Sequence, residues 1–273
     1  MRLLKSMALG LCASAVIAAP VFAQSTPEVT LTRMADCGTQ QAPTAVNERF
    51  SDSFAYGDLK VQFVFSCYLI KHGDEYMMWD TGHSMTAPNV APKTSIVDQL
   101  AKINVKPEQI KYVGISHYHQ DHTGQVASFP QATLLIGQGD WNAIIAPKPA
   151  AGVNAPPFAH WINGGGKVEP LANDKDVFGD GTVVVLNTPG HTPGHHAVLV
   201  KLNNRAFLIS GDLVHFNENY VTNGVPWFNA SRADSLASMD RFKQLATNLK
   251  ATVIIQHDAR DIGKLPAFPA AAK

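Results

Sequence analysis

The sequence has no excess of either charge. Its 273 residues include 22 lysines and arginines and 22 aspartates and glutamates, which gives a formal net charge of zero. Removing Arg2 and Lys5 with an N-terminal leader leaves 20 basic residues against 22 acidic ones. A nucleic-acid-binding protein would show a basic face or stripe. We therefore expect a small-molecule ligand and no nucleic-acid partner.

Cysteine is also scarce. Of three cysteines, Cys12 lies in the apolar N-terminal stretch, so only Cys37 and Cys67 remain beyond it. An oxidising compartment would let these two pair. Sequence spacing does not establish the geometry that a disulfide needs. A disulfide and two buried free thiols therefore both stay open at this point.

The first 23 residues have the pattern of a secretory signal peptide. A basic start precedes an apolar run that Pro20 interrupts, and Ala23 provides a small residue at the expected cleavage point. An uncleaved membrane anchor is the alternative, because no charge occurs between Lys5 and Glu28. We predict cleavage, no stable membrane insertion afterwards, and a periplasmic or secreted protein.

Residues 24–273 fit one compact α/β domain without internal repeats or low-complexity linkers. Capping pairs predict helices that begin at Ser95 and Ser231, with Asp98 and Asp234 three residues on. A Pro- and Gly-rich span, 146–166, suggests a surface or site-covering loop. Apolar runs predict strands within 59–70, 75–82, 111–117, 132–137, 181–188, 196–202, 205–211 and 251–258.

The stretch "ISHYHQDHTG", residues 115–124, concentrates groups that bind metals. Side chains two apart in extended backbone point the same way, so His117 and His119 can meet one metal. Asp121 and His122, past the bend, can reach another. Zinc accepts imidazole and carboxylate ligands, and a catalytic zinc keeps one position open for water. The spacing therefore predicts two adjacent metals.

Three further residues of the ligand type stand where predicted strands end. They are His191 in "NTPGHTPGHH", Asp212 in "LISGDLVHF" and His257 in "IIQHDAR". Strand ends in layered α/β folds are where sites collect. A chance group of histidines would not account for this placement, which favours a metal site.

These motifs resemble those of the metallo-β-lactamase-fold hydrolases, in which His-X-His-X-Asp-His precedes a distant His, Asp and His. "WDTG", "TPGHTPGH" and "SGD" extend the resemblance over most of the chain. It implies an αββα sandwich whose metals lie at one edge between two sheets. It also implies that the carboxylate of Asp80 in "WDTG" would fix a ligand imidazole. The alternative is that Asp80 is only a turn residue at the strand end.

The resemblance implies a complete ligand set for two zinc ions, although other divalent metals would suit it too. The first metal would take His117, His119 and His191, the second would take Asp121, His122 and His257, and Asp212 would bridge both. It implies that hydroxide attacks a lactone or ester carbonyl and that Asp121 moves a proton to the departing alkoxide. A Gly-X-Ser-X-Gly nucleophile motif is missing from the sequence, in agreement with this chemistry.

Within the family, the chain most resembles the N-acyl homoserine lactonases, the quorum-quenching branch. Residues 63–82 and 210–260 carry that resemblance. Lactonases of this branch place a tyrosine three residues after the bridging aspartate, where this chain has His215. A histidine can donate the same hydrogen bond or act as an acid. We therefore expect Asp121 and His215 to be catalytic, and Tyr220, Trp227 and Phe228 could line an acyl-chain wall.

Other functions fit the same residues. A β-lactamase or an organophosphate or aryl-ester hydrolase would use the same site, and an exported zinc-binding protein would use it without catalysis. The sequence gives no indication of an oligomeric state. Five further histidines lie outside the motif: we expect packing or turn roles for His195 and His196, and exposure to solvent for His72, His83 and His160.

Overall fold

The computed structural model describes residues 27–149 and 152–273. The predicted signal peptide, residues 1–23, lies outside these ranges. Within them, no helix combines the length and the apolar character that crossing a membrane requires.

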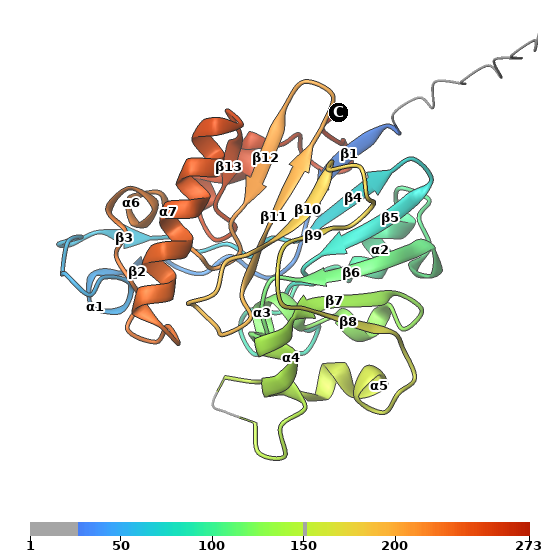
Figure 1. Ribbon diagram of the computed structural model, residues 1–273, viewed down its shortest axis with the longest axis horizontal. Helices are drawn as coiled ribbons and strands as arrows, with labels where there is room; N and C mark the ends of the chain where they lie inside the picture. Colours follow the sequence, from blue (N-terminus) through green and yellow to red (C-terminus); the bar gives the residue numbers. More distant parts are fainter. Residues whose placement is uncertain (1–26, 150–151) are drawn as a thin grey trace, which may run out of the picture.

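Two sheets build the body of the protein (Figure 1). The six-stranded sheet has the order β1-β4-β5-β6-β7-β8, and its four strands from β5 to β8 run parallel. These six strands are β1 (Val29–Arg33), β4 (Tyr68–His72), β5 (Glu75–Trp79), β6 (Ile110–Ile115), β7 (Thr133–Gly137) and β8 (Val168–Leu171).

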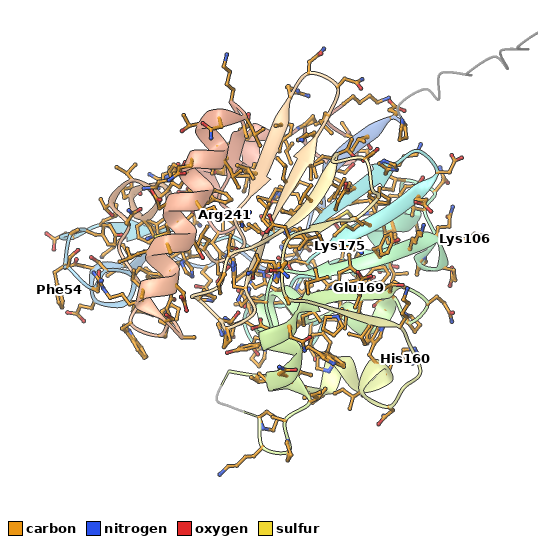
Figure 2. The ribbon with its side chains drawn as sticks, viewed as in Figure 1. Phe54, Lys106, His160, Glu169, Lys175 and Arg241 are labelled. Atoms are coloured by element: carbon orange, nitrogen blue, oxygen red, sulfur yellow. A yellow bond between two sulfur atoms is a disulfide. The ribbon has the colours of Figure 1, made fainter. Side chains whose placement is uncertain are left out.

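The second sheet has five strands in the order β13-β12-β11-β10-β9. Only the β12–β13 pair is parallel, so β10, β12 and β13 point the same way. The strands are β9 (Lys175–Asp176), β10 (Val183–Asn187), β11 (His196–Lys201), β12 (Ala206–Ile209) and β13 (Thr252–Ile254). At the sandwich edge, Lys175 Nζ of β9 lies 2.5 Å from Glu169 Oε1 of β8, which joins the two sheets (Figure 2).

Apolar side chains fill the space between the sheets because strand residues alternate between two faces. Trp79 and Met77 from one sheet belong to the same buried cluster as Val198 and Phe207 from the other. Helices cover the outer faces: α2 (Ile96–Ala101), α4 (Gln138–Ile144) and α5 (Ala159–Ile162) pack on the six-stranded sheet, and α7 (Arg232–Asn248) packs on the five-stranded one (Figure 1). The predicted αββα sandwich is confirmed.

The predicted helix starts are also confirmed. The Ser95 hydroxyl accepts a hydrogen bond from the backbone N–H of Asp98 at the start of α2, and Ser231 accepts from Asp234 at the start of α7. The shorter helical segments are α1 (Asn47–Phe50), α3 (Gln120–Thr123), α6 (Asn217–Thr222) and the 3₁₀ helices η1 (Pro107–Gln109), η2 (Val126–Ser128), η3 (Pro156–Phe158) and η4 (Ala259–Lys264).

The structure corrects two sequence expectations. The single strand predicted over residues 59–70 is split, because Lys60–Val61 forms β3, paired with β2 (Thr44–Ala45), before β4 begins at Tyr68. The 146–166 span is not only a loop, because η3 and α5 fold within it around the buried side chains of Phe158 and Trp161.

Cys37 and Cys67 form a disulfide, with 6.0 Å between their Cα atoms. The bond joins the segment after β1 to the residue before β4. It settles the alternative that the sequence left open and excludes two free thiols.

Candidate metal centre

The seven predicted ligands come from the carboxyl ends of strands that point to one edge of the sandwich. His117 follows β6 by two residues, and α3 then carries Asp121 and His122. His191, Asp212 and His257 lie in the turns after β10, β12 and β13. Parallel strand ends meet at one edge of a sheet, so residues far apart in the sequence converge there.

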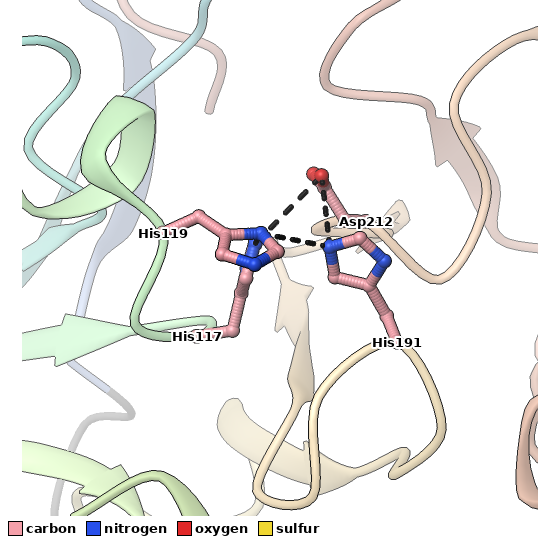
Figure 3. Close-up of side chains that lie close together, drawn as sticks. All are labelled: His117, His119, His191 and Asp212. Carbon is pink, nitrogen blue, oxygen red and sulfur yellow. Dashed lines mark hydrogen bonds and ion pairs between the residues drawn. The ribbon is translucent and has the colours of Figure 1, made fainter. Parts of the chain in front are cut away.

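The first predicted ligand group is His117, His119, His191 and Asp212, whose ligand atoms all lie within 4.8 Å of one another (Figure 3). His119 Nδ1 lies 2.9 Å from His117 Nε2 and 3.1 Å from His191 Nε2. Asp212 Oδ2 lies 3.4 Å from His191 Nε2 and 3.7 Å from His117 Nε2. One small cation could contact all four side chains.

The second group is Asp121, His122, Asp212 and His257, again within 4.8 Å of one another. Asp212 Oδ1 lies 2.8 Å from His257 Nε2 and 3.1 Å from His122 Nε2. Asp121 Oδ2 lies 3.5 Å from each of the same two nitrogens. Asp212 therefore turns one carboxylate oxygen toward each group, as a bridging ligand would.

Hydrogen bonds on the outer side of the imidazoles show why a cation fits. His257 Nδ1–H donates to the carbonyl of Val64 at 2.8 Å, and His122 Nδ1–H donates to Asp80 Oδ2 at 2.8 Å. In a neutral imidazole the other nitrogen is then an acceptor. The two Nε2 atoms nevertheless lie 3.3 Å apart beside the Asp212 carboxylate. Acceptors packed this closely need a positive charge between them, which protons or a metal can provide.

The pKa shifts of the site residues agree with a positive charge between these groups. Burial opposes the charged form of His122, but the Asp212 and Asp121 carboxylates outweigh it and raise its pKa. Burial also opposes ionisation of Asp212, yet His257 and His122 hold its pKa well below the usual value. In the first group, burial and neighbouring imidazoles lower the pKa of His191, so this ring is neutral and ready to act as a ligand.

Asp80 has the position that the family resemblance implies. Besides His122, its carboxylate accepts hydrogen bonds from the backbone N–H of Ser116 at 2.7 Å and from Gln256 Nε2 at 2.8 Å. Gln256 in turn accepts from Trp79 Nε1 and from the backbone N–H of Gly211. No sequence pattern marks Gln256 beyond its place beside His257.

His195 does more than fill space. Its Nε2 accepts the backbone N–H of Asp212 at 2.9 Å, and its Nδ1 lies 3.0 Å from the carbonyl of Thr188. The expectation of a packing role therefore misses a positioning role. His83 was also wrongly expected to be exposed, because its side chain is buried edge-on against Phe65 with 4.2 Å between ring centres.

Asp140 of α4 is a second residue that sequence reasoning missed. Its buried carboxylate accepts hydrogen bonds from Tyr118 N, Thr192 Oγ1 and Gly194 N at 2.7–3.0 Å. One side chain thus ties the loop that carries His117 and His119 to the loop that carries His191. No sequence motif marks it, because its partners are backbone groups from distant segments.

His215 stands at the predicted site, with Nε2 3.2 Å from Asp212 Oδ2. Its ring lies parallel to that of His257 at 5.9 Å and contacts Phe50 at 4.8 Å. Within the described part of the chain, neither ring nitrogen makes a hydrogen bond. The buried His215 ring therefore leaves hydrogen-bonding capacity unused within the site.

A cavity of about 510 Å³ opens onto both ligand groups. Phe228 lines it, as expected, but Tyr220 and Trp227 do not belong to its lining: Tyr220 packs against Phe242, and Trp227 is exposed. Its aromatic wall is formed by Phe50, Phe63, Phe65 and Phe228, its deep end by His119, Asp121, His191, Asp212, His215 and His257, and its polar rim includes Gln41, Arg49, Gln120 and Asn154.

The fold, the converging ligands and the cavity define a class of protein. The model of the Metallo-beta-lactamase superfamily matches residues 64–257, more than half of the chain. The chain belongs to the metallo-β-lactamase superfamily. The structure brings the predicted residues together in two groups, and their binding of metal stays a prediction.

Several relatives of the chain are named as one kind of enzyme within the superfamily, N-acyl homoserine lactonases. The chain is 34% identical to "N-acyl homoserine lactonase AttM" of Agrobacterium fabrum over 178 residues, 59% of this chain and 63% of that protein. It thus spans less than two thirds of the length of that relative. It is 27% identical to an "N-acyl homoserine lactonase" of a Bacillus species over 225 residues, 74% of this chain and 84% of the relative.

Solved structures share the fold. An N-acyl homoserine lactone hydrolase with N-hexanoyl-L-homoserine at its catalytic metal centre superposes with a TM-score of 0.71 at 19% identity, covering 91% of this chain and all of that one. AidC, a dizinc quorum-quenching lactonase, gives a TM-score of 0.62 at 20% identity, with 91% of both chains covered.

Proposed function

We propose that the protein is an exported hydrolase that binds two zinc ions and opens the ring of N-acyl homoserine lactones. The observation that carries the proposal is the placement of Asp212, which offers one carboxylate oxygen to each of two ligand groups beneath an open cavity. The lactonase names of its relatives support the choice of substrate.

Two zinc ions in these groups would lower the pKa of bound water and polarise a carbonyl oxygen. Asp121 lines the cavity and also faces His257 and His122. Burial opposes ionisation of Asp121, but His122 holds its pKa well below the usual value, so it is a carboxylate at neutral pH. It can accept a proton and return it to the alkoxide that leaves when the ring opens.

His215 would act on the carbonyl oxygen. Its ring is held between Phe50 and His257 and lines the cavity, and neither ring nitrogen has a hydrogen-bond partner in the described residues. It can therefore donate the hydrogen bond that a tyrosine supplies in similar lactonases. The aromatic wall formed by Phe50, Phe63, Phe65 and Phe228 would hold the acyl chain.

Export to the periplasm or the medium is supported by the leader pattern of residues 1–23 and by the Cys37–Cys67 disulfide, because such bonds persist in oxidising compartments. Cell fractionation with N-terminal sequencing of the recovered protein tests this part. We expect a chain that begins at Gln24. Recovery of the full-length chain from the cytoplasm or the membrane would contradict it.

The activity is tested by metal analysis of the purified protein together with a pH-stat assay. The panel contains acyl homoserine lactones, a simple lactone, a cephalosporin and a phosphotriester. We expect close to two zinc ions per chain and fastest turnover of the acyl homoserine lactones. If the protein binds two metals but turns over only the cephalosporin or the phosphotriester, its activity belongs to another branch of the superfamily. If it binds two metals and turns over none of these substrates, it is a zinc-binding protein without catalysis.

Variants connect that activity to the proposed ligands. Asp212→Ala and His191→Ala each remove a ligand, and we expect both to abolish lactone opening and to lower the bound zinc. Asp240→Asn is the matched control, because Asp240 lies exposed on α7 and, within the described part of the chain, its side chain accepts a hydrogen bond only from Gln244. Substantial turnover by either folded ligand variant would refute the two-metal assignment.

A further inference from the structure

Arg49 differs from the other arginines of the described chain in having no polar partner for its side chain. Arg232 and Arg241 form ion pairs with Asp52 and Asp174. Arg260 pairs with Glu218 and Asp258, Arg33 donates to Ser66, and Arg205 donates to the carbonyl of Lys273. No hydrogen bond or ion pair of the Arg49 guanidinium occurs within residues 27–149 and 152–273.

This unpaired guanidinium lies on the rim of the catalytic cavity. Its Cζ stands 5.3 Å from the ring centre of Phe50 and 5.7 Å from that of Phe228, two rings of the aromatic wall. Among the described residues that line the cavity, Arg49 is the only lysine or arginine. The stacking holds the cation in place and leaves its N–H groups free for a ligand.

The backbone fixes the position of Arg49 as well. Its carbonyl accepts the N–H of Trp227, which ties α1 to the segment that carries Phe228. Its neighbour Phe50 contacts the His215 ring, and His215 reaches Asp212 at 3.2 Å. A continuous set of contacts therefore runs from the Arg49 cation at the rim to the bridging carboxylate at the base.

We propose that Arg49 binds a carboxylate that the substrate carries at the end remote from the ester bond that is opened. A guanidinium matches a planar carboxylate with two parallel N–H donors, and such charge-assisted bonds are stronger than neutral ones. The favoured substrate is then an acyl lactone with three parts: the lactone at the metal groups, an apolar chain along the phenylalanine wall and an anionic end at Arg49. This proposal rests on the proposed lactonase function and narrows its substrate class.

The test compares three acyl homoserine lactones of equal chain length whose acyl chains end in a carboxylate, a carboxamide or a methyl group, each made in several lengths. We expect kcat/KM of the zinc-loaded protein to be about tenfold higher for the carboxylate at its best length, the size of one partly exposed charge-assisted hydrogen bond. The gain should lie in KM and shrink as salt is added. Equal kcat/KM values for the carboxylate and the carboxamide would overturn the proposal that Arg49 binds an anionic group.

Two variants isolate the charge. Arg49→Met keeps an apolar stem over Phe50 and Phe228, and we expect it to remove the preference for the carboxylate over the methyl end. Arg49→Lys keeps the charge without the planar pair of donors and should retain only part of the preference. Arg205→Met is the matched control, because Arg205 stacks on Phe207 at 5.4 Å outside the cavity lining. An unchanged preference in Arg49→Met would overturn the proposal.

Binding separates this proposal from the proposed function. The corresponding γ-lactams keep the acyl chain but resist hydrolysis, so their dissociation constants can be measured by calorimetry whether or not the protein opens lactones. Tighter binding of the carboxylate-ended lactam that depends on Arg49 would support the proposal even if every lactone proved inert. Fast lactone opening without an Arg49-dependent preference for the carboxylate end would agree with the proposed lactonase function and contradict the anion site.

Discussion

Asp80 Oδ2 accepts a hydrogen bond from His122 Nδ1 at 2.8 Å, which turns His122 Nε2 toward Asp212 and the second ligand group. The same carboxylate holds the backbone N–H of Ser116, one residue before His117. A single buried aspartate thus orients one predicted ligand directly and supports the strand end that delivers another. Such outer hydrogen bonds fix the tautomer and the orientation of metal-binding imidazoles.

We therefore predict that Asp80→Asn weakens zinc binding. The amide keeps the shape of the carboxylate, but it has one acceptor oxygen where three donors converge, so at least one donor loses its partner. The expected loss is about tenfold to one hundredfold in zinc affinity. Competition with a chromophoric chelator measures it, with the exposed Asp240→Asn variant as control. Equal affinities in both variants would show that Asp80 is only a turn residue.

Asp140 is predicted to support the site from the opposite side. Asp140→Ala leaves the N–H groups of Tyr118 and Gly194 and the Thr192 hydroxyl without their acceptor in the interior. Each unsatisfied buried donor costs about 1–3 kcal/mol, so we expect the free energy of unfolding to fall by about 3 kcal/mol or more. Denaturant titration gives this value, and chelator competition should show weaker zinc binding in the variant that still folds.

Because His83 is buried, we predict that the free energy of unfolding depends on pH. Burial lowers its pKa to about 4, against 6.5 in the unfolded chain. The unfolded state then binds more protons between these values, so this contribution to stability is complete above pH 6.5 and is lost as the pH falls toward 4. From pH 7.5 to pH 5 the loss amounts to about 2 kcal/mol.

The His83→Leu variant tests that contribution. We expect its free energy of unfolding to fall less than that of the wild type over the same pH range, because leucine cannot take up the proton. Acid loss of metal affects both proteins and cancels in the difference. Parallel stability curves for the two proteins would mean that His83 does not titrate in this range.

The sequence was most informative where chemistry and backbone pattern agree. The 115–124 stretch and the strand ends at His191, Asp212 and His257 predicted the groups that the structure brings together, because side-chain type and strand direction suffice there. The capping pairs of α2 and α7 succeeded for the same local reason.

Features that depend on tertiary contacts were not predictable. His195, Gln256 and Asp140 act through backbone groups of distant segments, and no local pattern marks such bonds. His83 was wrongly expected at the surface because its burial depends on Phe65, from another segment of the chain. Arg49 lies in the four-residue helix α1, too short for a periodicity, and its place on the cavity rim comes from the loop that carries Phe228.

The disulfide predicts a measurable stabilisation. Cys37 and Cys67 are 30 residues apart, and closing a loop of that length in the unfolded chain stabilises the fold by about 3–4 kcal/mol on the chain-entropy estimate. The Cys37→Ser/Cys67→Ser double variant should lose that amount in a denaturant titration. Adding a reductant should destabilise the wild type and leave the double variant unchanged. If the reductant destabilised both proteins equally, its effect would not come from this disulfide.

His215 allows the proposed carbonyl contact to be tested within one position. His215→Phe keeps a ring between Phe50 and His257 but removes both nitrogens, and His215→Tyr restores a hydrogen-bond donor. If His215 stabilises charge on the carbonyl oxygen, the phenylalanine variant should lose about one hundredfold to one thousandfold in kcat, and the tyrosine variant should recover a large part of it. Zinc content should stay the same in both, because His215 is not among the predicted ligands. Equal kcat in the wild type and the phenylalanine variant would instead assign His215 to the apolar wall, because a ring that only packs is replaced by phenylalanine without loss.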